Sequence, residues 1–213
     1  MKIRSEEFNL FGENTYIVWD EKSGDAAIID PGMMNNEEEQ ALDDTITKLG
    51  IKPVHLINTH LHIDHCFGNE YVKERYGLRT EAHSKDAPLG EQLSGQASMF
   101  HLRGANPTPL RIDHTLNEGD RIYLGDEYLE VLEVPGHSPG SIVLYSPQGG
   151  FVIVGDVLFR GSIGRTDLPG GSMLQLQQNI RSKLMNLPDD TIVYPGHGPA
   201  TTIGYEKTYN PYI

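Results

Sequence analysis

Short runs of apolar residues, separated by turns rich in Gly, Pro and Asp, predict a chain built largely from β-strands. The strands are expected at residues 14–19, 26–30, 54–57, 121–124, 128–134, 141–145, 151–154 and 191–194. Only a short polar segment separates the first two, and this spacing predicts a β-hairpin.

Helical periodicity appears between these strands. A helix is predicted to begin at Asn36, whose side chain can cap it, and to end at Gly50. A shorter helix is expected over residues 71–76, and a later one is expected to begin at Ser172, which stands three residues before a glutamine. Residues 87–109 have weak periodicity and are predicted to form a partly helical connection. Strands followed by a helix in both halves predict an α/β fold, with helices outside the sheets.

The length of 213 residues suits one sizeable core, so we expect a single domain over residues 1–213. The apolar runs are far shorter than the roughly 20 residues needed to cross a bilayer. The N-terminal residues reach acidic side chains at once and lack the apolar core of a secretory signal. We therefore expect a cytoplasmic protein that does not associate with membranes.

Charge and cysteine content restrict the possible partners. The net charge of -13 disfavours nucleic acid as a partner, because lysine and arginine supply most of the affinity for phosphates. The single cysteine, Cys66, excludes an internal disulfide and fits a reducing compartment. We expect it to be a small buried hydrophobic residue, although it borders the most polar motif of the chain.

That motif places four potential metal ligands within six residues, directly after the strand at 54–57. They are His60, His62, Asp64 and His65. This density is unusual for a surface and too polar for a core, and alternate positions of an extended loop face the same side. The motif therefore predicts a metal site on a loop between a strand and a helix.

Three further candidates, His137, Asp156 and His197, each follow a strand, and each comes directly after a glycine. Glycine allows a tight turn and a close approach of the backbone to an ion, so we expect all three to converge on the same pocket. Seven donors exceed the needs of one catalytic zinc, which takes three protein ligands and a water. Two divalent ions account for the count, and five imidazoles with two carboxylates suit zinc, iron or manganese.

The run from Thr59 to His65, followed by these three residues, resembles the metallo-β-lactamase superfamily over almost the whole chain. The resemblance implies a four-layer αββα sandwich that holds two metals at one edge. It also implies the roles of the individual side chains, with His60, His62 and His137 on one ion, Asp64, His65 and His197 on the other, Asp156 bridging the two and Asp30 supporting the metal loop.

Asp156 and residues 159–171 look like the short glyoxalase II-type proteins, which resemble hydroxyacylglutathione hydrolases. The resemblance implies a small-molecule thioester substrate and two metal ions, with zinc as first choice. A hydroxide shared by the ions would attack the thioester carbonyl, and Asp64 would orient it and take part in proton transfer. Residues 66–69 depart from the family pattern of two consecutive glycines after the metal loop. The chain ends soon after His197, without the helical domain that grips glutathione in full-length glyoxalase II, so recognition of glutathione stays open.

Other functions remain compatible with this sequence. An iron-dependent persulfide dioxygenase of the same fold would use a mononuclear site formed by His60, His137 and Asp156. A lactonase would use the same nucleophile on a cyclic ester, and a non-enzymatic module would only hold metal for a partner. The oligomeric state is not specified by the sequence.

Other polar residues, which lie outside the metal-ligand pattern, are expected to stabilise the structure or to face solvent. Arg165 and Asp167 are predicted to form an ion pair after Asp156. Four isolated histidines are predicted to be hydrogen-bonded or exposed to solvent, namely His55, His83, His101 and His114.

Overall fold

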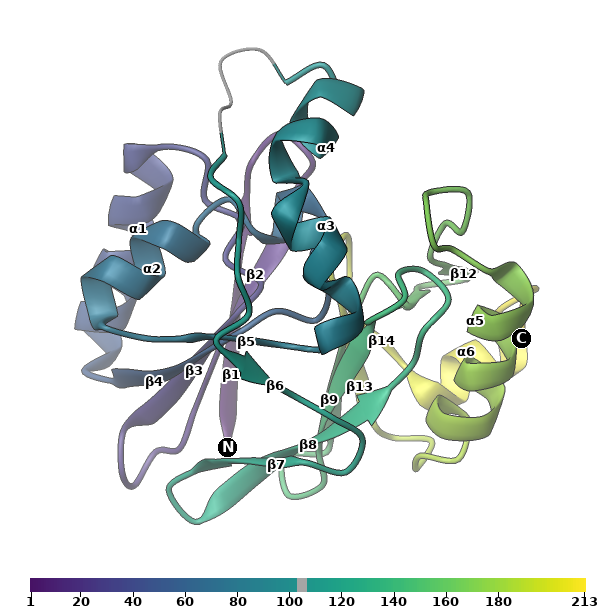
Figure 1. Ribbon diagram of the computed structural model, residues 1–213. Coiled ribbons are helices and arrows are strands. Elements are labelled where there is room, and N and C mark those ends of the chain that lie inside the picture. Colours follow the sequence, from purple (N-terminus) through teal and green to yellow (C-terminus); the bar gives the residue numbers. More distant parts are fainter. Residues whose placement is uncertain (103–106) are drawn as a thin grey trace.

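The computed structural model describes residues 1–102 and 107–213, and two six-stranded sheets form its centre (Figure 1). The first sheet has the order β1-β2-β3-β4-β5-β6. Its strands are β1 (Lys2–Phe8), β2 (Glu13–Trp19), β3 (Asp25–Ile29), β4 (Lys52–Ile57), β5 (Thr80–Ala82) and β6 (His114–Thr115). β1, β2 and β3 pair antiparallel, and the sheet continues in parallel from β3 to β6.

The second sheet has the order β14-β13-β10-β9-β8-β7 and is antiparallel except where β10 meets β13. Its strands are β7 (Arg121–Leu124), β8 (Glu127–Glu133), β9 (Ile142–Ser146), β10 (Phe151–Gly155), β13 (Ile192–Pro195) and β14 (Thr201–Thr202). A separate small hairpin consists of β11 (Leu158–Phe159) and β12 (Ser162–Ile163).

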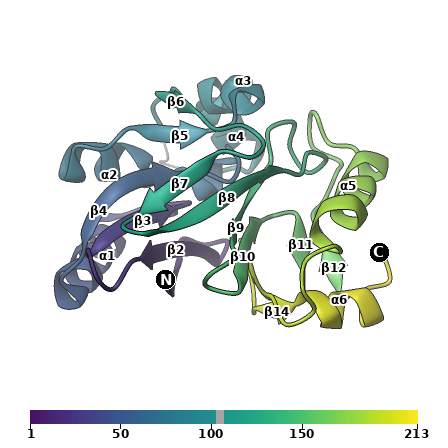
Figure 2. The same ribbon diagram turned by 90° about the horizontal axis from the view of Figure 1, so that it is seen from below.

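Helices cover the outer faces of both sheets, as Figures 1 and 2 show from two directions. On the first sheet lie α1 (Asn36–Leu49) and α2 (Asn69–Tyr76), with α3 (Ala87–Glu91) and α4 (Leu93–Met99) beside them. On the second lie α5 (Met173–Asn179), a π-helical continuation η3 (Ile180–Leu184) and α6 (Ile203–Tyr209). Two short 3-10 turns complete the set, η1 (Ile63–His65) and η2 (Ser84–Asp86). The layers therefore follow the expected order αββα.

Alternation along the strands explains these layers, because successive side chains of a strand point to opposite faces. In β3, Ala27 and Ile29 belong to the core between the sheets, whereas Ile28 packs with Leu42 and Ile46 of α1. Strands of the second sheet alternate in the same way between this central core and the core under α5 and α6. Burial of apolar surface on both faces of each sheet thus holds the sandwich together.

The eight predicted strands are all present, with ends within two residues of those expected. The prediction of the cap of α1 was wrong. Asn35, not Asn36, accepts hydrogen bonds from the backbone N–H groups of Glu37 and Glu38, so Asn36 is already the first helical residue. Ser172 caps α5 as predicted, by accepting from the backbone N–H of Gln175.

Several elements were not predicted. β1 has mostly exposed polar side chains at the edge of its sheet, and β6 and β14 have only two residues each, so periodicity gives little signal for them. The connection predicted at 87–109 contains α3 and α4, and its residues 103–106 lie outside the described residues.

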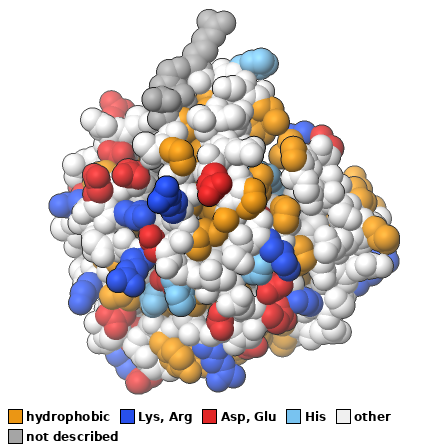
Figure 3. Space-filling view, in the orientation of Figure 1, with side chains coloured by type: hydrophobic (Ala, Val, Ile, Leu, Met, Phe, Trp, Pro, Cys, Tyr) orange, Lys and Arg blue, Asp and Glu red, His pale blue; other side chains and the backbone are white. Residues whose placement is uncertain are grey.

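The distribution of charged side chains over the surface can be seen on one face of the molecule. On the face shown in Figure 3, acidic and basic side chains are interspersed, and the basic ones form no continuous band. Within residues 1–102 and 107–213, every helix is too short or too polar to cross a membrane.

Candidate metal centre

The seven predicted metal donors come together at one edge of the sandwich, on loops that follow strands of both sheets. The loop after β4 and the turn η1 carry four of them, and the loop between β8 and β9 carries His137. Asp156 follows β10 and His197 follows β13. Segments far apart in the sequence thus meet where these strands end, as the recurrent placement after strands predicts.

The first group of donors consists of three buried histidines, His60, His62 and His137. His137 Nε2 lies 3.3 Å from His60 Nε2 and 2.9 Å from His62 Nδ1. His137 Nδ1 donates to the carbonyl of Arg165 at 2.8 Å, and His60 Nδ1 lies 3.1 Å from the hydroxyl of Thr59. With protons on these two Nδ1 atoms, both Nε2 atoms present lone pairs to each other. A cation between them would remove this repulsion.

The second group consists of Asp64, His65 and His197. Asp64 Oδ2 lies 3.2 Å from His197 Nε2 and 3.8 Å from His65 Nε2. In both histidines the Nδ1 atom, on the side of the ring away from Asp64, has its own hydrogen-bond partner. His65 Nδ1 lies 3.2 Å from Asp30 Oδ2, and His197 Nδ1 lies 3.1 Å from the carbonyl of Phe11. When both rings are neutral, as metal ligands must be, this pattern leaves both Nε2 atoms as acceptors that face the carboxylate.

Asp156 lies between the two groups. Its Oδ1 is 3.4 Å from His65 Nε2 and 3.6 Å from His197 Nε2, while its Oδ2 is 3.7 Å from His137 Nε2. One carboxylate therefore faces both groups, each with a different oxygen.

Unsatisfied polar atoms test whether this cluster fits metal ions. Within the described part of the chain, four buried side-chain atoms have no hydrogen-bond partner, and His65 Nε2 and Asp156 Oδ1 are two of them. An unpaired buried polar atom costs about 1–3 kcal/mol, so two such atoms 3.4 Å apart need a common partner. Imidazole and carboxylate donors in this arrangement fit divalent zinc, iron or manganese.

The electrostatics of the two groups differ. Burial lowers the pKa of His60, and it lowers the pKa of His62 to about 3, with the neighbouring imidazoles adding to the effect. Burial also opposes charge on His65, but the carboxylates of Asp64 and Asp156 outweigh it and raise the pKa of His65. His60 and His62 therefore stay neutral, while the second group is built around the negative charge of Asp64, which a cation would balance.

Asp30 makes the contacts expected of a residue that supports the metal loop. It is buried at the end of β3 and has a positive φ of 51°. Its Oδ1 accepts from the backbone N–H of Thr59 at 2.7 Å, and its Oδ2 accepts from the Thr59 hydroxyl at 2.6 Å and contacts His65 Nδ1. Its distance to His60 and His65 would also permit metal binding, but these hydrogen bonds already occupy both oxygens.

Two of the predicted glycines are required by close approach of other groups. Gly155 has a φ of 48°, and a Cβ there would lie 2.2 Å from Thr59 Oγ1. A Cβ on Gly196 would lie 2.4 Å from Asp156 Oδ1 and 2.6 Å from His65 Cε1. Any larger residue at these positions would displace side chains of the cluster.

Sequence reasoning missed Asp86, a fully buried aspartate that joins the two loops of the first histidine group. Its Oδ1 accepts from the backbone N–H of Gly140 at 2.6 Å. Its Oδ2 accepts from the Ser138 hydroxyl at 2.8 Å and from the backbone N–H of Leu61 at 3.1 Å. Leu61 adjoins His60, and Ser138 adjoins His137. Asp86 stands alone in the sequence, so no spacing could reveal this role.

Replacing Asp86 with alanine is expected to lower the free energy of unfolding by roughly 2–5 kcal/mol, because buried donors lose their acceptor. The variant should also retain less metal, since the loops that carry His60 and His137 are no longer joined. Urea denaturation and metal analysis would measure both effects. Asp167→Ala is the matched control, because Asp167 is exposed and should change neither quantity. An Asp86→Ala protein with the stability of the wild type would contradict this role.

The residues interpreted as structural behave as predicted. Arg165 donates to both oxygens of Asp167, at 2.7 Å each. His55 contacts Glu81 at 2.6 Å. His83 contacts Glu133, and His101 and His114 are exposed. Cys66 is buried, and burial raises the pKa of its thiol, which disfavours the reactive thiolate.

Comparison with known proteins agrees with this geometry. The sequence profile of the metallo-beta-lactamase superfamily matches residues 9–197. Hydroxyacylglutathione hydrolase GloC of Haemophilus influenzae is 38% identical, over 100% of this chain and 98% of its own. The crystal structure of the BLEG-1 B3 metallo-beta-lactamase has a TM-score of 0.88 at 32% identity, over 99% of each chain. That of TTHA1623 in a di-iron-bound form has a TM-score of 0.86 at 36% identity, over 99% of this chain and 100% of its own. The chain belongs to the metallo-beta-lactamase superfamily and has its αββα fold.

Proposed function

We propose that this protein is a hydrolase with two divalent metal ions that cleaves thioesters in the manner of glyoxalase II. His60, His62 and His137 would hold one ion and Asp64, His65 and His197 the other, with Asp156 shared. The main support for two ions is the position of Asp156, because one of its oxygens faces His65 and His197 and the other faces His137. Similarity to a protein with a di-iron-bound form supports two ions. Zinc is our first choice, with iron or manganese as alternatives.

The chemistry required is the attack of water on an acyl carbon. Two cations held by these residues would supply an acidified water and polarise the carbonyl oxygen. Although burial opposes it, the neighbouring His65 and His197 lower the pKa of Asp64, so Asp64 is a carboxylate at neutral pH. Asp64 is only partly buried, and the carboxylate oxygen that does not face His65 and His197 can accept a hydrogen bond from the attacking water and hold the proton that it releases. A thiolate is a good leaving group, so the chain needs no strong acid beside it.

The choice of a thioester rests on the relatives. GloC, which is called a hydroxyacylglutathione hydrolase, is similar over the whole length of this chain. The segment after Asp156, residues 159–171, also resembles the short glyoxalase II-type proteins. Both features favour a thioester over a lactam or a lactone.

The test is metal content per chain of the purified protein, together with hydrolysis of S-D-lactoylglutathione. About two metals per chain with turnover are expected, as in two-metal hydrolytic sites. A single iron per chain, with oxygen uptake on a persulfide and no thioester hydrolysis, would overturn the proposal in favour of a dioxygenase. Hydrolysis of lactones but not of thioesters would agree with the proposed metal centre and contradict the proposed thioester substrate.

A further inference from the structure

A shallow hollow of about 500 Å³ borders His197. It is lined by Phe159, Arg160, Ser162, His197, Gly198 and Pro199. Its walls are mostly apolar, and the ring of Phe159 lies 6.4 Å from that of His197. Because His197 also belongs to the second donor group, the hollow adjoins the candidate metal centre.

The side of the hollow that carries Arg160 is rigidly anchored. Arg160 lies in the turn between β11 and β12, and the next residue, Gly161, donates its backbone N–H to Glu206 Oε2 at 3.0 Å. Glu206 is fully buried in α6. Asn210 Nδ2 donates to the carbonyl of Ser162 at 3.0 Å. The turn is thus held directly after Arg160, at Gly161 and Ser162, by α6 and the residue that follows it.

Arg160 itself is exposed and has no carboxylate partner within 4.0 Å among the residues that the structure describes. Nine of the described lysines and arginines form ion pairs with carboxylates, whereas Arg160 and Arg121 are among those that do not. The guanidinium instead lies over the ring of Tyr205, 5.2 Å from the centroid. Stacking on a ring restrains the side chain and leaves its N–H donors available.

We propose that Arg160 binds a carboxylate of the substrate, so that the preferred substrates are thioesters of an anionic thiol. This inference rests on the proposed function and names its substrate class. A guanidinium matches a carboxylate with two parallel hydrogen bonds, which a lysine cannot offer. The acyl group of a hydroxyacyl thioester is short, so the thiol half is the part long enough to extend past His197 along Phe159 and Pro199 to Arg160.

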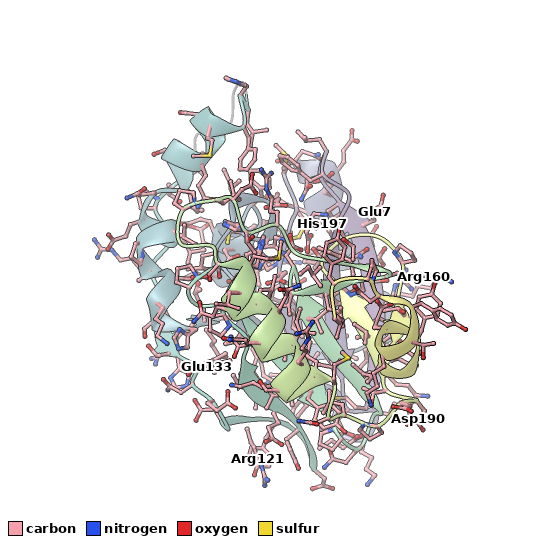
Figure 4. The ribbon with its side chains drawn as sticks, turned by 90° about the vertical axis from the view of Figure 1, so that its right-hand side faces the viewer. Glu7, Arg121, Glu133, Arg160, Asp190 and His197 are labelled. Atoms are coloured by element: carbon pink, nitrogen blue, oxygen red, sulfur yellow. The ribbon has the colours of Figure 1, made fainter. Side chains whose placement is uncertain are left out.

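The experiment compares Arg160→Gln with Arg121→Gln in the metal-loaded protein. Arg121 is a matched control, since it is also exposed and also lies over a tyrosine ring, that of Tyr128 at 4.5 Å. It lies at the far end of the molecule from His197, whereas Arg160 lies on the same side as His197 (Figure 4). The same charge is removed in both variants.

Two thioesters and one inert ligand serve as probes. S-D-lactoylglutathione has an anionic thiol, S-lactoyl-N-acetylcysteamine has a neutral one, and S-methylglutathione binds without being cleaved. Arg160→Gln should lower kcat/KM for the first by about tenfold or more and leave the second unchanged, as expected for the loss of a charge-assisted hydrogen-bonded pair. Calorimetry should show an equal loss of affinity for S-methylglutathione. Arg121→Gln should behave as the wild type.

The outcomes separate this inference from the proposed function. Equal losses on both thioesters, or equal effects of the two variants, would overturn the role of Arg160 and leave the thioesterase intact. Binding of S-methylglutathione that depends on Arg160, without hydrolysis of either thioester, would retain the anion site and overturn the thioesterase. Absence of both binding and hydrolysis would overturn both.

Discussion

Replacing Asp156 with asparagine is expected to lower metal content at both positions and to reduce hydrolysis by more than about 100-fold. Loss of a residue that only supports a metal ligand typically costs 10–100-fold, so loss of a shared donor should exceed that range. Asp156 has one oxygen near His65 and His197 of the second group and the other near His137 of the first. Asparagine keeps the shape of the side chain but offers only one, uncharged oxygen. Its NH₂ group would donate to a histidine Nε2 atom and so occupy a lone pair that a metal ion needs. Metal analysis after gel filtration and initial rates with S-D-lactoylglutathione are the measurements.

Asp167→Asn provides the matched control for this variant. Asp167 lies on the same connection after β10, but it is exposed and pairs with Arg165. Its replacement should leave metal content near that of the wild type. If Asp156→Asn lost only one of two ions and kept most of its activity, Asp156 would belong to one group alone and the shared position would be wrong.

Helices and strands could be predicted from the sequence wherever a buried face makes apolar residues recur in a regular pattern. β3 is apolar on both faces because it lies between α1 and the second sheet, and this appears in the sequence as a continuous apolar run. β1 has no such signal, because it is a polar edge strand held by its pairing with β2. Asn35 and Asn36 are equally good caps by type, and only the path of the backbone decides between them.

The residues of the candidate site also differ in whether the sequence reveals them. The donors could be found because they are dense in the loop after β4 and recur after glycines at strand ends. Asp86 could not be found, since its importance comes from joining two loops that are more than 50 residues apart in the sequence. Arg160 could not be selected from sequence either. Its place over the ring of Tyr205 and in the same hollow as His197 is recognisable only in the folded chain.

Asp64→Asn is expected to abolish most thioester hydrolysis and to distinguish the two leading functions. In the proposed hydrolase Asp64 would have two roles, as a metal ligand beside His65 and His197 and as the acceptor of a proton from water. General bases contribute about 100- to 10,000-fold to turnover, so kcat should fall by at least about 100-fold. Rates measured at saturating zinc, with metal content determined in parallel, separate the two roles: a protein that regains two ions but not its activity has lost the proton acceptor.

A mononuclear dioxygenase predicts another result for the same variant, because it would use only His60, His137 and Asp156. Asp64 lies in the other group, 3.2 Å from His197, and its replacement would leave those three side chains in place. Oxygen uptake on a persulfide would then persist in Asp64→Asn and disappear in Asp156→Asn. The hydrolase instead requires both variants to be inactive on thioesters. Near-normal hydrolysis by Asp64→Asn would mean that proton transfer proceeds without this carboxylate, and the role assigned to Asp64 would have to be abandoned.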